Sequence, residues 1–537
     1  MRRIRLAPTA AAVAIGVAVL LSTSSGLAAP GARSLPRGLA RAIRARLGDG
    51  PIGFAARRAG NPDFGLRVSI SNDGTTALVS APGLANGKGA VYVYHAADAG
   101  SWTSSATPAA TLTITATRHD LFFGQGVALS SDGTTAFIGA PGLIGTGAVY
   151  VFHVATEDAW TSTSAPAATL TVKHAVSIGY SIAASQDGTT VVVGAPFANT
   201  FKGAAYVFHA SAEDAWTSAS APSATLTDAA EPASDGGVGG VVALSADGTT
   251  ALLSDSGAGS SAGAAYVFHV ASESGWATSS APTATLSNGA GFANAGLGAS
   301  LALSADGTTA FLGAPGVGGD KGALDVFHAA DETSWATTAT PTAILTDGSV
   351  GSGAELGAFV RASADGATVV ATAPGVKKRT GAADVFHVAD EASWTATGTP
   401  TATLTDSTRK HGDLLGVGLA VAGDGATVLL GAPGVNWYTG AADVFHVADA
   451  GSWVTSPTAT ATLTNAALPA PACVVPRIKG LPLFLAKVML ADATCRLGHV
   501  KHVHVTSKKL RGRVVSQSPK PGKQLAPGAK VSVKIGK

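Results

Sequence analysis

From residue 59 to residue 468 one arrangement of apolar and polar positions recurs along the chain. Runs of four to six residues rich in Val, Ala, Ile and Phe alternate with turns rich in Asp, Gly, Ser and Thr. In the second unit the runs span residues 127–130, 134–138, 148–153 and 168–171. Short runs bounded by turn residues are typical of β-strands, and the pair Asp132-Gly133 indicates a tight hairpin because both positions tolerate positive φ. Each unit is therefore predicted to form four antiparallel strands.

Three sequence markers keep the same register in seven copies. An Asp-Gly pair recurs at intervals of 55 to 60 residues, beginning at Asp73, Asp132, Asp187, Asp247, Asp306, Asp365 and Asp424. An aromatic-His pair ends at His95, His153, His209, His269, His328, His387 and His446. A tryptophan follows each histidine seven residues later, at Trp102, Trp160, Trp216, Trp276, Trp335, Trp394 and Trp453. Seven units of four short strands predict an all-β fold, a seven-bladed β-propeller over residues 59–468.

The repeated tryptophans and histidines are predicted to be structural. A large apolar residue at one offset in every copy is typical of packing between strands. A histidine that ends one strand in each unit is typical of a satisfied polar contact. The alternatives are a set of sugar-binding tryptophans and a ring of histidine ligands.

The first 58 residues differ from the repeat. Arg2, Arg3 and Arg5 precede an apolar run, and small residues follow up to Ala29. This order is typical of a secretory signal peptide over residues 1–29, with an uncleaved anchor as the alternative. Residues 30–58 are basic and are predicted to be a linker or pro-segment, with an amphipathic surface helix as the alternative. The mature protein is therefore expected to be secreted, with no transmembrane segment after cleavage.

The last part of the chain, residues 469–537, is predicted to be a separate small α+β domain. Residues 471–537 hold fourteen Lys and Arg but one acid, Asp492. A helix is expected over 481–493, and strands over 513–517 and 530–535. Cys473 and Cys495 flank the helix, and we expect a disulfide between them because an exported protein meets an oxidising environment. Free structural cysteines are the alternative, and a metal site at the nearby histidines is not expected.

The propeller repeats resemble a known family. Phe123-Gly124, Gly139-Ala140-Pro141 and the run from Gly147 to Phe152 are similar to the FG-GAP repeats of integrin α-subunit propellers and their bacterial relatives. Family members that bind Ca²⁺ carry an Asp-x-Asp-x-Asp-Gly loop, because a hard cation needs several oxygen ligands. Here each loop is reduced to the Asp-Gly turn. We therefore expect no calcium site, no other metal and no cofactor in the propeller.

The C-terminal segment resembles a second family. Val475-Pro476, Gly480, Gln517-Ser518-Pro519, Pro521-Gly522 and the run Val531–Val533 are similar to a PASTA domain. That module occurs in extracellular parts of bacterial penicillin-binding proteins and serine/threonine kinases. The resemblance implies binding to peptidoglycan or muropeptides, and hence association with the bacterial cell wall.

Charge is distributed unevenly along the chain. The formal charge is +9 over residues 1–58, −20 over 59–470 and +13 over 471–537. Alternate loops of an antiparallel blade lie on opposite faces, so the Asp-Gly turns are predicted to share an acidic face with the loops before the tryptophans. The Gly-Ala-Pro loops and the connections between units are predicted to share the other face, with ten of the twelve basic residues; Arg67 and Arg361 are the exceptions. The basic C-terminal module is expected to dock on the acidic face when no wall is present.

Basic and aromatic side chains gather in the variable loops of copies six and seven. Such a patch suits an acidic glycan or a protein partner, whereas the acidic remainder of the propeller argues against nucleic acid. Ordinary solvated loops are the alternative. The candidate binding residues are Lys377, Lys378, Arg379, Arg409, Lys410, Trp437 and Tyr438.

Candidate catalytic groups are few. Copies 5–7 carry Asp325, Asp384 and Asp443 where copies 1–4 carry tyrosine, and a local polar network is the expected role of these acids. The chain is therefore predicted to be a secreted, non-enzymatic bacterial surface protein whose C-terminal module contacts peptidoglycan and whose propeller presents an interaction face. The alternatives are a carbohydrate-active enzyme at the cell wall, which would need a close acid pair at the propeller channel, and a purely structural wall component.

Overall fold

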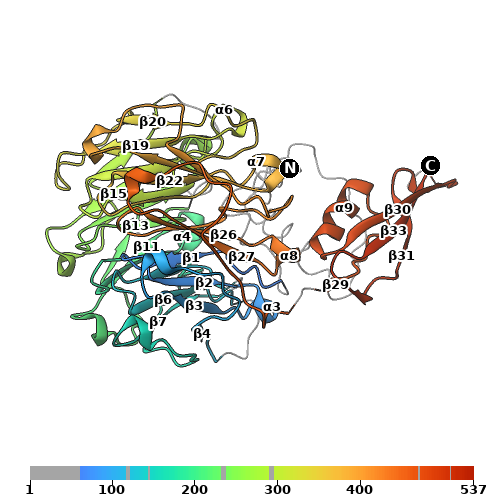
Figure 1. The fold of residues 1–537 in the computed structure, drawn as a ribbon, viewed down its shortest axis with the longest axis horizontal. Coiled ribbons are helices and arrows are strands. Elements are labelled where there is room, and N and C mark those ends of the chain that lie inside the picture. Colours follow the sequence, from blue (N-terminus) through green and yellow to red (C-terminus); the bar gives the residue numbers. More distant parts are fainter. Residues whose placement is uncertain are drawn as a thin grey trace, which may run out of the picture.

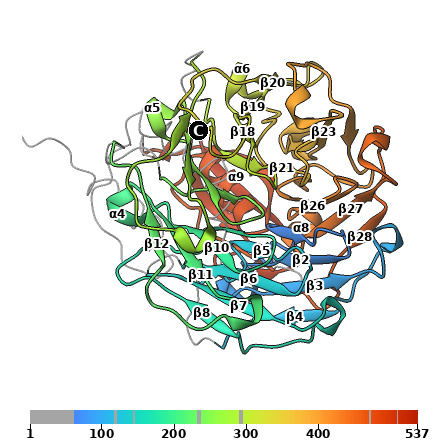
Figure 2. The ribbon, with the colours of Figure 1, turned by 90° about the vertical axis from the view of Figure 1, so that its left-hand side faces the viewer.

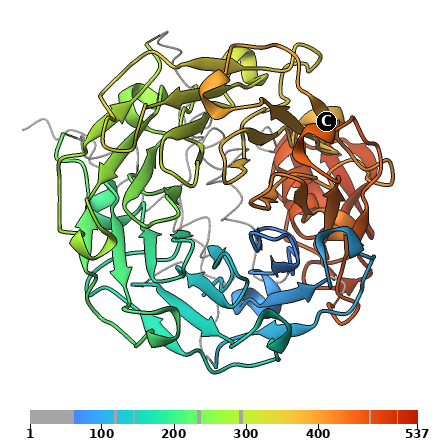
Figure 3. The same cartoon turned by 60° about the vertical axis from the view of Figure 1, so that its left-hand side comes forward.

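The computed structural model describes residues 61–115, 121–142, 145–230, 237–289, 295–469, 472–507 and 510–537. The predicted signal peptide (1–29) and basic linker (30–58) lie outside the described residues. Seven four-stranded antiparallel sheets follow one another along the chain and close into a ring, and a smaller module follows them (Figures 1 and 3). The chain is therefore a seven-bladed β-propeller with a C-terminal α+β module.

Each blade consists of four consecutive strands. Blade 1 comprises β1 (Val68–Ile70), β2 (Thr76–Ser80), β3 (Val91–His95) and β4 (Ala110–Leu112). Blade 2 comprises β5 (Val127–Leu129), β6 (Thr135–Ala140), β7 (Ala148–His153) and β8 (Ala168–Leu170). Blade 3 comprises β9 (Ser181–Ala184), β10 (Thr190–Gly194), β11 (Ala205–His209) and β12 (Ala224–Leu226). Blade 4 comprises β13 (Val242–Leu244), β14 (Thr250–Asp255), β15 (Ala264–His269) and β16 (Ala284–Leu286).

The remaining blades repeat the order. Blade 5 comprises β17 (Ser300–Leu303), β18 (Thr309–Gly313), β19 (Leu324–His328) and β20 (Ala343–Leu345). Blade 6 comprises β21 (Val360–Ala362), β22 (Thr368–Thr372), β23 (Ala383–His387) and β24 (Ala402–Leu404). Blade 7 comprises β25 (Gly418–Val421), β26 (Thr427–Ala432), β27 (Ala441–His446) and β28 (Ala461–Leu463).

Short turns occupy the loops on the two faces. Four-residue turns follow the second strands, at α3 (Leu84–Gly87), α4 (Ala198–Phe201), α5 (Ala258–Ser261), α6 (Val317–Asp320), α7 (Val376–Arg379) and α8 (Val435–Tyr438). Single 3₁₀ turns precede the tryptophans, at η3 (Ala99–Ser101), η4 (Glu157–Ala159), η5 (Glu213–Ala215), η6 (Glu273–Gly275), η7 (Glu391–Ser393) and η8 (Ala450–Ser452).

The first strand of each blade lies innermost. β1 contacts both β5 and β25, and β13 contacts both β9 and β17, so the first strands of successive blades line the axis of the ring. Second strands are buried along their whole length, as in β2, because they are covered by a blade on either side. A strand covered on both faces needs apolar residues at consecutive positions, which explains the unbroken apolar runs in the sequence.

The glycines of the repeated motifs allow neighbouring blades to touch through their backbones. A Cβ on Gly139, in Gly-Ala-Pro of blade 2, would lie 2.0 Å from the carbonyl oxygen of Gly179 at the start of blade 3. A Cβ on Gly313 would lie 2.0 Å from the carbonyl oxygen of Gly357 in the next blade. Where blade 7 meets blade 1 and the ring closes, a Cβ on Gly431 would lie 1.8 Å from the carbonyl oxygen of Gly65. A side chain at any of these three glycines would clash with the backbone of the next blade, so close approach requires glycine there. Blades 1, 4 and 6 carry Ser80, Ser254 and Thr372 at the same position of the repeat.

The repeated tryptophans and histidines are structural, as predicted. All seven tryptophans are 4% to 7% exposed. In each blade the tryptophan Nε1 donates to the carbonyl oxygen of the Asp-Gly glycine, as Trp160 does to Gly133 at 2.9 Å. Each histidine Nδ1 is hydrogen-bonded to a threonine Oγ1 on the second strand of its blade, as in Thr76 and His95 at 3.0 Å. The tryptophan contact also shows that the Asp-Gly turns and tryptophan loops share one face.

The C-terminal module has its own core and a three-stranded sheet. β30 (Arg496–Val503) runs parallel to β33 (Lys530–Gly536), which pairs antiparallel with β31 (Val514–Ser518). β29 (Cys473–Val474) pairs with β32 (Gln524–Leu525), and α9 (Leu483–Asp492) packs on the sheet through Ala486 and Leu490. The predicted disulfide joins Cys473 to Cys495. Within the described ranges, no helix is long and apolar enough to cross a membrane.

Candidate functional site

The structure brings most of the predicted basic residues together. α7 carries Lys377, Lys378 and Arg379, and its two lysines are exposed. The connection that leads to blade 7 is tied to this turn: the backbone N–H of Gly412 donates to the Arg379 carbonyl at 3.1 Å, and His411 Nδ1 lies 3.1 Å from the Lys378 carbonyl. Exposed Lys410 therefore lies beside the exposed lysines of α7.

Arg409 belongs to a different environment from its neighbours in the sequence. Its side chain is only 7% exposed and forms a two-pronged ion pair with Asp443 on β27, with Nε 2.9 Å from Oδ2 and a second bond from Nη2 to Oδ1. Nε also lies 3.2 Å from a carboxylate oxygen of Asp406. Burial alone would lower the pKa of Arg409, but Asp443 and Asp406 raise it above its ordinary value. Arg409 thus joins blades 6 and 7 and does not present its charge to solvent.

Trp437, the one tryptophan outside the repeat register, contacts the C-terminal module. The guanidinium carbon of Arg496 lies 4.4 Å from the centre of its ring. A Cβ on Gly528 would lie 2.3 Å from the indole, so the ring rests directly against this glycine. Arg–Trp stacking is the strongest class of cation–π contact in proteins. The indole is therefore used in a contact within the chain, which a ligand of Trp437 would have to share or displace.

This contact places the module on the other side of the propeller from the one expected. Trp437 lies in α8, in a loop that follows a second strand, and Figure 1 shows the module beside the side that carries α7 and α8. Figure 2 views the ring with its opposite side toward the reader. The expected docking on the acidic Asp-Gly face is thus wrong for this structure. In this structure the module contacts the propeller through Trp437, on the face opposite the acidic Asp-Gly turns.

Tyr438 helps to close the ring. Its backbone carbonyl accepts a hydrogen bond from the N–H of Asp63 at 3.0 Å, which joins blade 7 to the start of blade 1. Its side chain packs beside Leu66, Leu414 and Val417. Tyr438 therefore helps to join blade 7 to blade 1, where the ring of blades closes.

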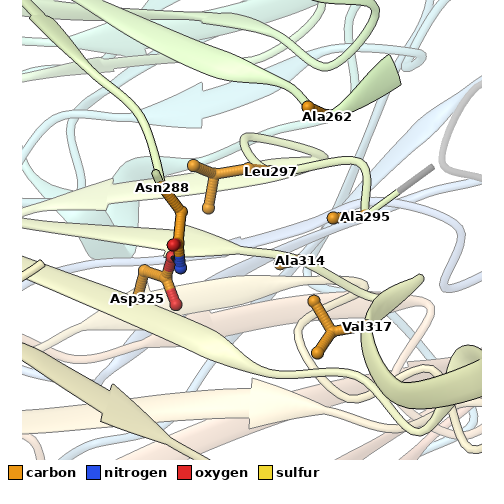
Figure 4. Close-up of a pocket in the computed structure, with 7 residues that line it drawn as sticks. All are labelled: Ala262, Asn288, Ala295, Leu297, Ala314, Val317 and Asp325. Atoms are coloured by element: carbon orange, nitrogen blue, oxygen red, sulfur yellow. Dashed lines mark hydrogen bonds between the residues drawn. The ribbon is translucent and has the colours of Figure 1, made fainter. Parts of the chain in front are cut away.

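Asp325, Asp384 and Asp443 lie on third strands of separate blades, away from the innermost first strands. Each is engaged by the connection from the preceding blade. Asn288 Nδ2 donates to Asp325 Oδ2 at 2.6 Å, and Figure 4 shows these two side chains facing one another beside a small cavity lined by Leu297 and Val317. Burial raises the pKa of Asp325 to about 6. The three acids form separate polar links between blades, and no close pair of them stands at the axis.

Asp384 faces another acid instead of a cation. It is 1% exposed, accepts a hydrogen bond from Thr403 Oγ1 at 2.8 Å, and lies against the carboxyl group of Asp347. Burial and, to a lesser extent, the neighbouring Asp347 raise the pKa of Asp384 to about 7. The sequence shows where Asp384 lies in the repeat, but its partner Asp347 is found only through the packing of the connection.

The Asp-Gly face is hollowed where blades 3, 4 and 5 meet. An open depression of about 890 Å³ is lined there by Asp187, Asp247, Asp306, Asp331 and Glu332, among others. The turn aspartates already have partners: Ser185 Oγ and Thr189 donate to Asp187, and although burial raises its pKa, these bonds lower it overall. Among the residues that the structure describes, no three His, Cys, Asp or Glu side chains gather as a metal site requires.

Residues 474–537 match the PASTA domain family. No curated protein matches the chain significantly. Among solved structures, the hydrazine synthase of Kuenenia stuttgartiensis is similar at 12% sequence identity with a TM-score of 0.44, covering 72% of this chain and 97% of that chain. The structure of the matched region contains the predicted helix and strands, and the disulfide joins Cys473 to Cys495. The C-terminal module is therefore a PASTA domain.

Proposed function

We propose that this protein is an exported, non-enzymatic binding protein of the bacterial cell wall. The PASTA domain at residues 474–537 carries the proposal, because PASTA domains bind peptidoglycan-related ligands. The signal-peptide pattern of residues 1–29 supports export, and the disulfide suits an oxidising location. In this proposal the PASTA domain attaches the chain to the wall and the propeller presents an interaction face.

The surface of the PASTA domain supports contact with an anionic polymer. The domain holds fourteen Lys and Arg and a single acid, Asp492, so it carries a large positive charge. Lys501, Lys520 and Lys523 are all exposed, and Phe484 and Leu485 on α9 are 51% and 39% exposed. Exposed apolar side chains among cations suit a ligand with both carboxylates and apolar ring faces, such as a muropeptide.

We infer that the propeller is built from FG-GAP-type repeats. The inference rests on the motif residues and on one contact between them: Gly431 of Gly-Ala-Pro meets Gly65 of Phe64-Gly65 across the boundary between blades 7 and 1. In blades 3 to 7 the glycine at the Phe-Gly position follows Ile, Val or Leu, as in Ile178-Gly179.

The basic loops of blades 6 and 7 supply a second proposed contact site. Lys377, Lys378 and Lys410 are exposed on the side of the ring that carries the PASTA domain (Figure 1). Together with that domain they form one basic surface, which suits an acidic glycan or an acidic protein partner. Arg409 is excluded from this proposed surface because its charge is neutralised inside the propeller.

Calorimetric titration of the full-length protein with purified muropeptides tests the wall contact. We expect saturable binding that persists at 0.5 M salt with reduced affinity, because charge supplies part of the affinity and apolar contact the rest. Phe484→Ala is expected to weaken the binding, and Lys321→Gln, which changes an exposed lysine of blade 5, is the control. The absence of saturable binding at low salt would contradict the proposal.

The basic loop surface is tested separately, with wall glycan fragments that carry acidic groups. A Lys377→Gln/Lys378→Gln/Lys410→Gln variant is expected to lose affinity, whereas Lys173→Gln with Lys202→Gln, which changes lysines in blade 3 loops of the same face, should not. Equal affinity of the triple variant and the natural chain would show that these lysines are not a binding surface.

A further inference from the structure

Arg67 and Arg361 are the two basic residues of the propeller that stand outside its loops, in blades 1 and 6. Arg67 immediately precedes β1, and Arg361 lies within β21, so both stand on innermost strands. Arg67 lies over the ring of Phe359, two residues before Arg361 in the chain, so the two arginines stand near each other at the axis of the ring. The surrounding protein, and to a lesser extent Arg67, lower the pKa of Arg361.

Both guanidinium groups contact protein atoms, although Arg67 is only half-buried and Arg361 is exposed. Arg67 lies over the ring of Phe359, 5.5 Å from its centre, and donates to the Leu66 carbonyl at 3.1 Å. Arg361 donates to the carbonyls of Val360 at 2.9 Å and Leu301 at 3.3 Å. Arg361 remains accessible to water although burial lowers its pKa to about 10.

Neither arginine has a carboxylate partner among the described residues. They contact backbone carbonyls and an aromatic ring, in contrast to Arg409, which has two carboxylates. In a propeller with a charge of −20, acidic residues are abundant, so the lack of one beside these two cations is a marked departure.

Tyr180 adds an unused donor to the same region. It precedes β9 in blade 3, is 6% exposed, and its hydroxyl has no hydrogen-bond partner among the described residues. The tyrosine and Arg67 interact electrostatically, so the hydroxyl lies within the field of the guanidinium. Buried hydroxyl groups are normally paired, so the Tyr180 hydroxyl is a donor that the described residues leave unused.

The repeat itself does not require these residues. Counted from the glycine that opens each blade, Arg361 stands where the other six blades carry small residues, namely Ser69, Ala128, Ala183, Ala243, Ala302 and Ala420. Arg67 stands where the others carry Gly126, Ser181, Val241, Ser300, Phe359 and Gly418. Six copies close their blades without a cation here, so packing alone does not account for either arginine.

We propose that Arg67, Arg361 and Tyr180 form an oxyanion-binding site on the axis of the propeller. The ligand is an organic anion that carries a carboxylate or a phosphate, since the donors are two guanidinium groups and a hydroxyl while the ring of Phe359 lies beside them. Two arginines from different blades hold one oxyanion by charge-assisted hydrogen bonds, and Tyr180 supplies a neutral donor. This site is separate from the proposed wall contacts and would exist even if those were wrong.

The test is calorimetric titration of the full-length protein with citrate and with pyrophosphate at low salt. We expect saturable binding of at least one anion, with citrate favoured if the site is built for carboxylates and pyrophosphate favoured if it is built for phosphates. Arg67→Gln and Arg361→Gln should each weaken that binding by about tenfold or more, because a hydrogen bond to a charged group is lost. Tyr180→Phe should weaken it by a smaller factor, and exposed Lys321→Gln should leave it unchanged.

Thermal unfolding without an added anion separates a binding role from a structural one. If the arginines bind an anion, Arg361→Gln should unfold at the same or a higher temperature than the natural chain, because it removes the repulsion between Arg361 and Arg67. The proposal is overturned if neither anion binds saturably, if the Arg67→Gln/Arg361→Gln double variant binds as the natural chain does, or if all anions including chloride bind equally weakly. Tyr180→Phe removes one oxygen atom and so keeps the test decisive if an arginine variant does not fold.

Discussion

Asp384 in blade 6 and Asp443 in blade 7 occupy the same position of the repeat but face different neighbours. Asp443 is bound by the guanidinium of Arg409, which Asp406 also contacts. Asp384 faces Asp347, and residue 350, three positions after that acid, is a valine where blade 7 has Arg409. Burial raises the pKa of both carboxyl groups, but only Asp443 has a cation, Arg409, that opposes this rise.

The Asp384→Asn variant should be more stable than the natural chain at pH 8. The pKa of Asp384 is about 7 in the folded protein and near 4 in an unfolded chain, so the folded protein binds the proton more tightly. The stabilisation of the folded protein by proton binding at Asp384 is fully present below about pH 4 and is lost as the pH rises through about 7. Urea unfolding at pH 5 and pH 8 should show a gain on the order of 2–4 kcal/mol at pH 8 and a smaller one at pH 5.

Asp443→Asn is the matched control, because the same change removes a charge that Arg409 uses. It should destabilise the protein at both pH values by roughly 1–3 kcal/mol. A stability gain in Asp443→Asn, or a loss in Asp384→Asn at pH 8, would show that the two carboxyl groups do not differ as described.

Between elements, a glutamate three residues before the tryptophan links adjacent blades. Glu273 of blade 4 accepts hydrogen bonds from Thr189 and Thr190 of blade 3 at 2.9 and 2.7 Å. Glu157 and Glu332 make the same contacts across their own blade boundaries. Blades 1 and 7 carry alanine at this position, Ala99 and Ala450, so both boundaries of blade 7 lack the glutamate.

Glu273→Ala should therefore lower the free energy of unfolding by about 1 kcal/mol, a modest value because the carboxylate is partly exposed to solvent. Glu213→Ala is the control: Glu213 holds the same position in blade 3, but its Oε1 has no hydrogen-bond partner among the described residues. Thermal unfolding of both variants checks the difference. Equal losses would mean that the threonine contacts contribute nothing specific.

The repeat markers predicted the blades because each marker has a local structural cause. The Asp-Gly turn and the tryptophan that caps it lie 27 or 28 residues apart in one blade, so their register fixes the four strands. The expected helix over 481–493 and strand over 134–138 differ from the observed Leu483–Asp492 and Thr135–Ala140 by one or two residues at each end. Element ends depend on capping contacts that apolar runs do not specify.

The candidate binding residues were harder to predict, because their roles depend on neighbours distant in the sequence. Lys377, Lys378 and Lys410 share a surface as expected from the order of the loops. Arg409 points inward because it pairs with Asp443, which lies 34 residues later in the chain, in the next blade. Nothing in the sequence pairs Trp437 with Arg496, since that contact depends on how two separately folded domains meet.

At the scale of the whole molecule, Trp437 holds the PASTA domain against the propeller. Trp437→Ala should release the domain, because the stacking on Arg496 and the contact with Gly528 are both lost. Small-angle X-ray scattering should then show a larger radius of gyration and a longer maximum dimension. Trp102→Phe, a conservative change inside blade 1, is the control. An unchanged scattering profile for Trp437→Ala would mean that other contacts position the domain.

The distribution of charge gives this arrangement a consequence. The acidic Asp-Gly face is left open, and the basic loops of blades 6 and 7 lie on the same side as the basic PASTA domain (Figure 1). A wall-bound molecule would therefore present its acidic face away from the anionic polymer. The formal charge of +2 is therefore the sum of a basic N-terminal segment, a strongly acidic propeller and a strongly basic C-terminal domain, and the acidic and basic surfaces of the propeller and the domain lie on opposite sides of the molecule.

Co-sedimentation with purified peptidoglycan sacculi tests the central claim most directly. Full-length protein should pellet with sacculi in a saturable manner, and a chain that ends at residue 469 should remain in the supernatant while retaining the circular dichroism of the propeller. If the shortened chain pellets as well as the full-length protein, or if the full-length protein does not pellet at all, the PASTA domain is not what holds this protein to the wall.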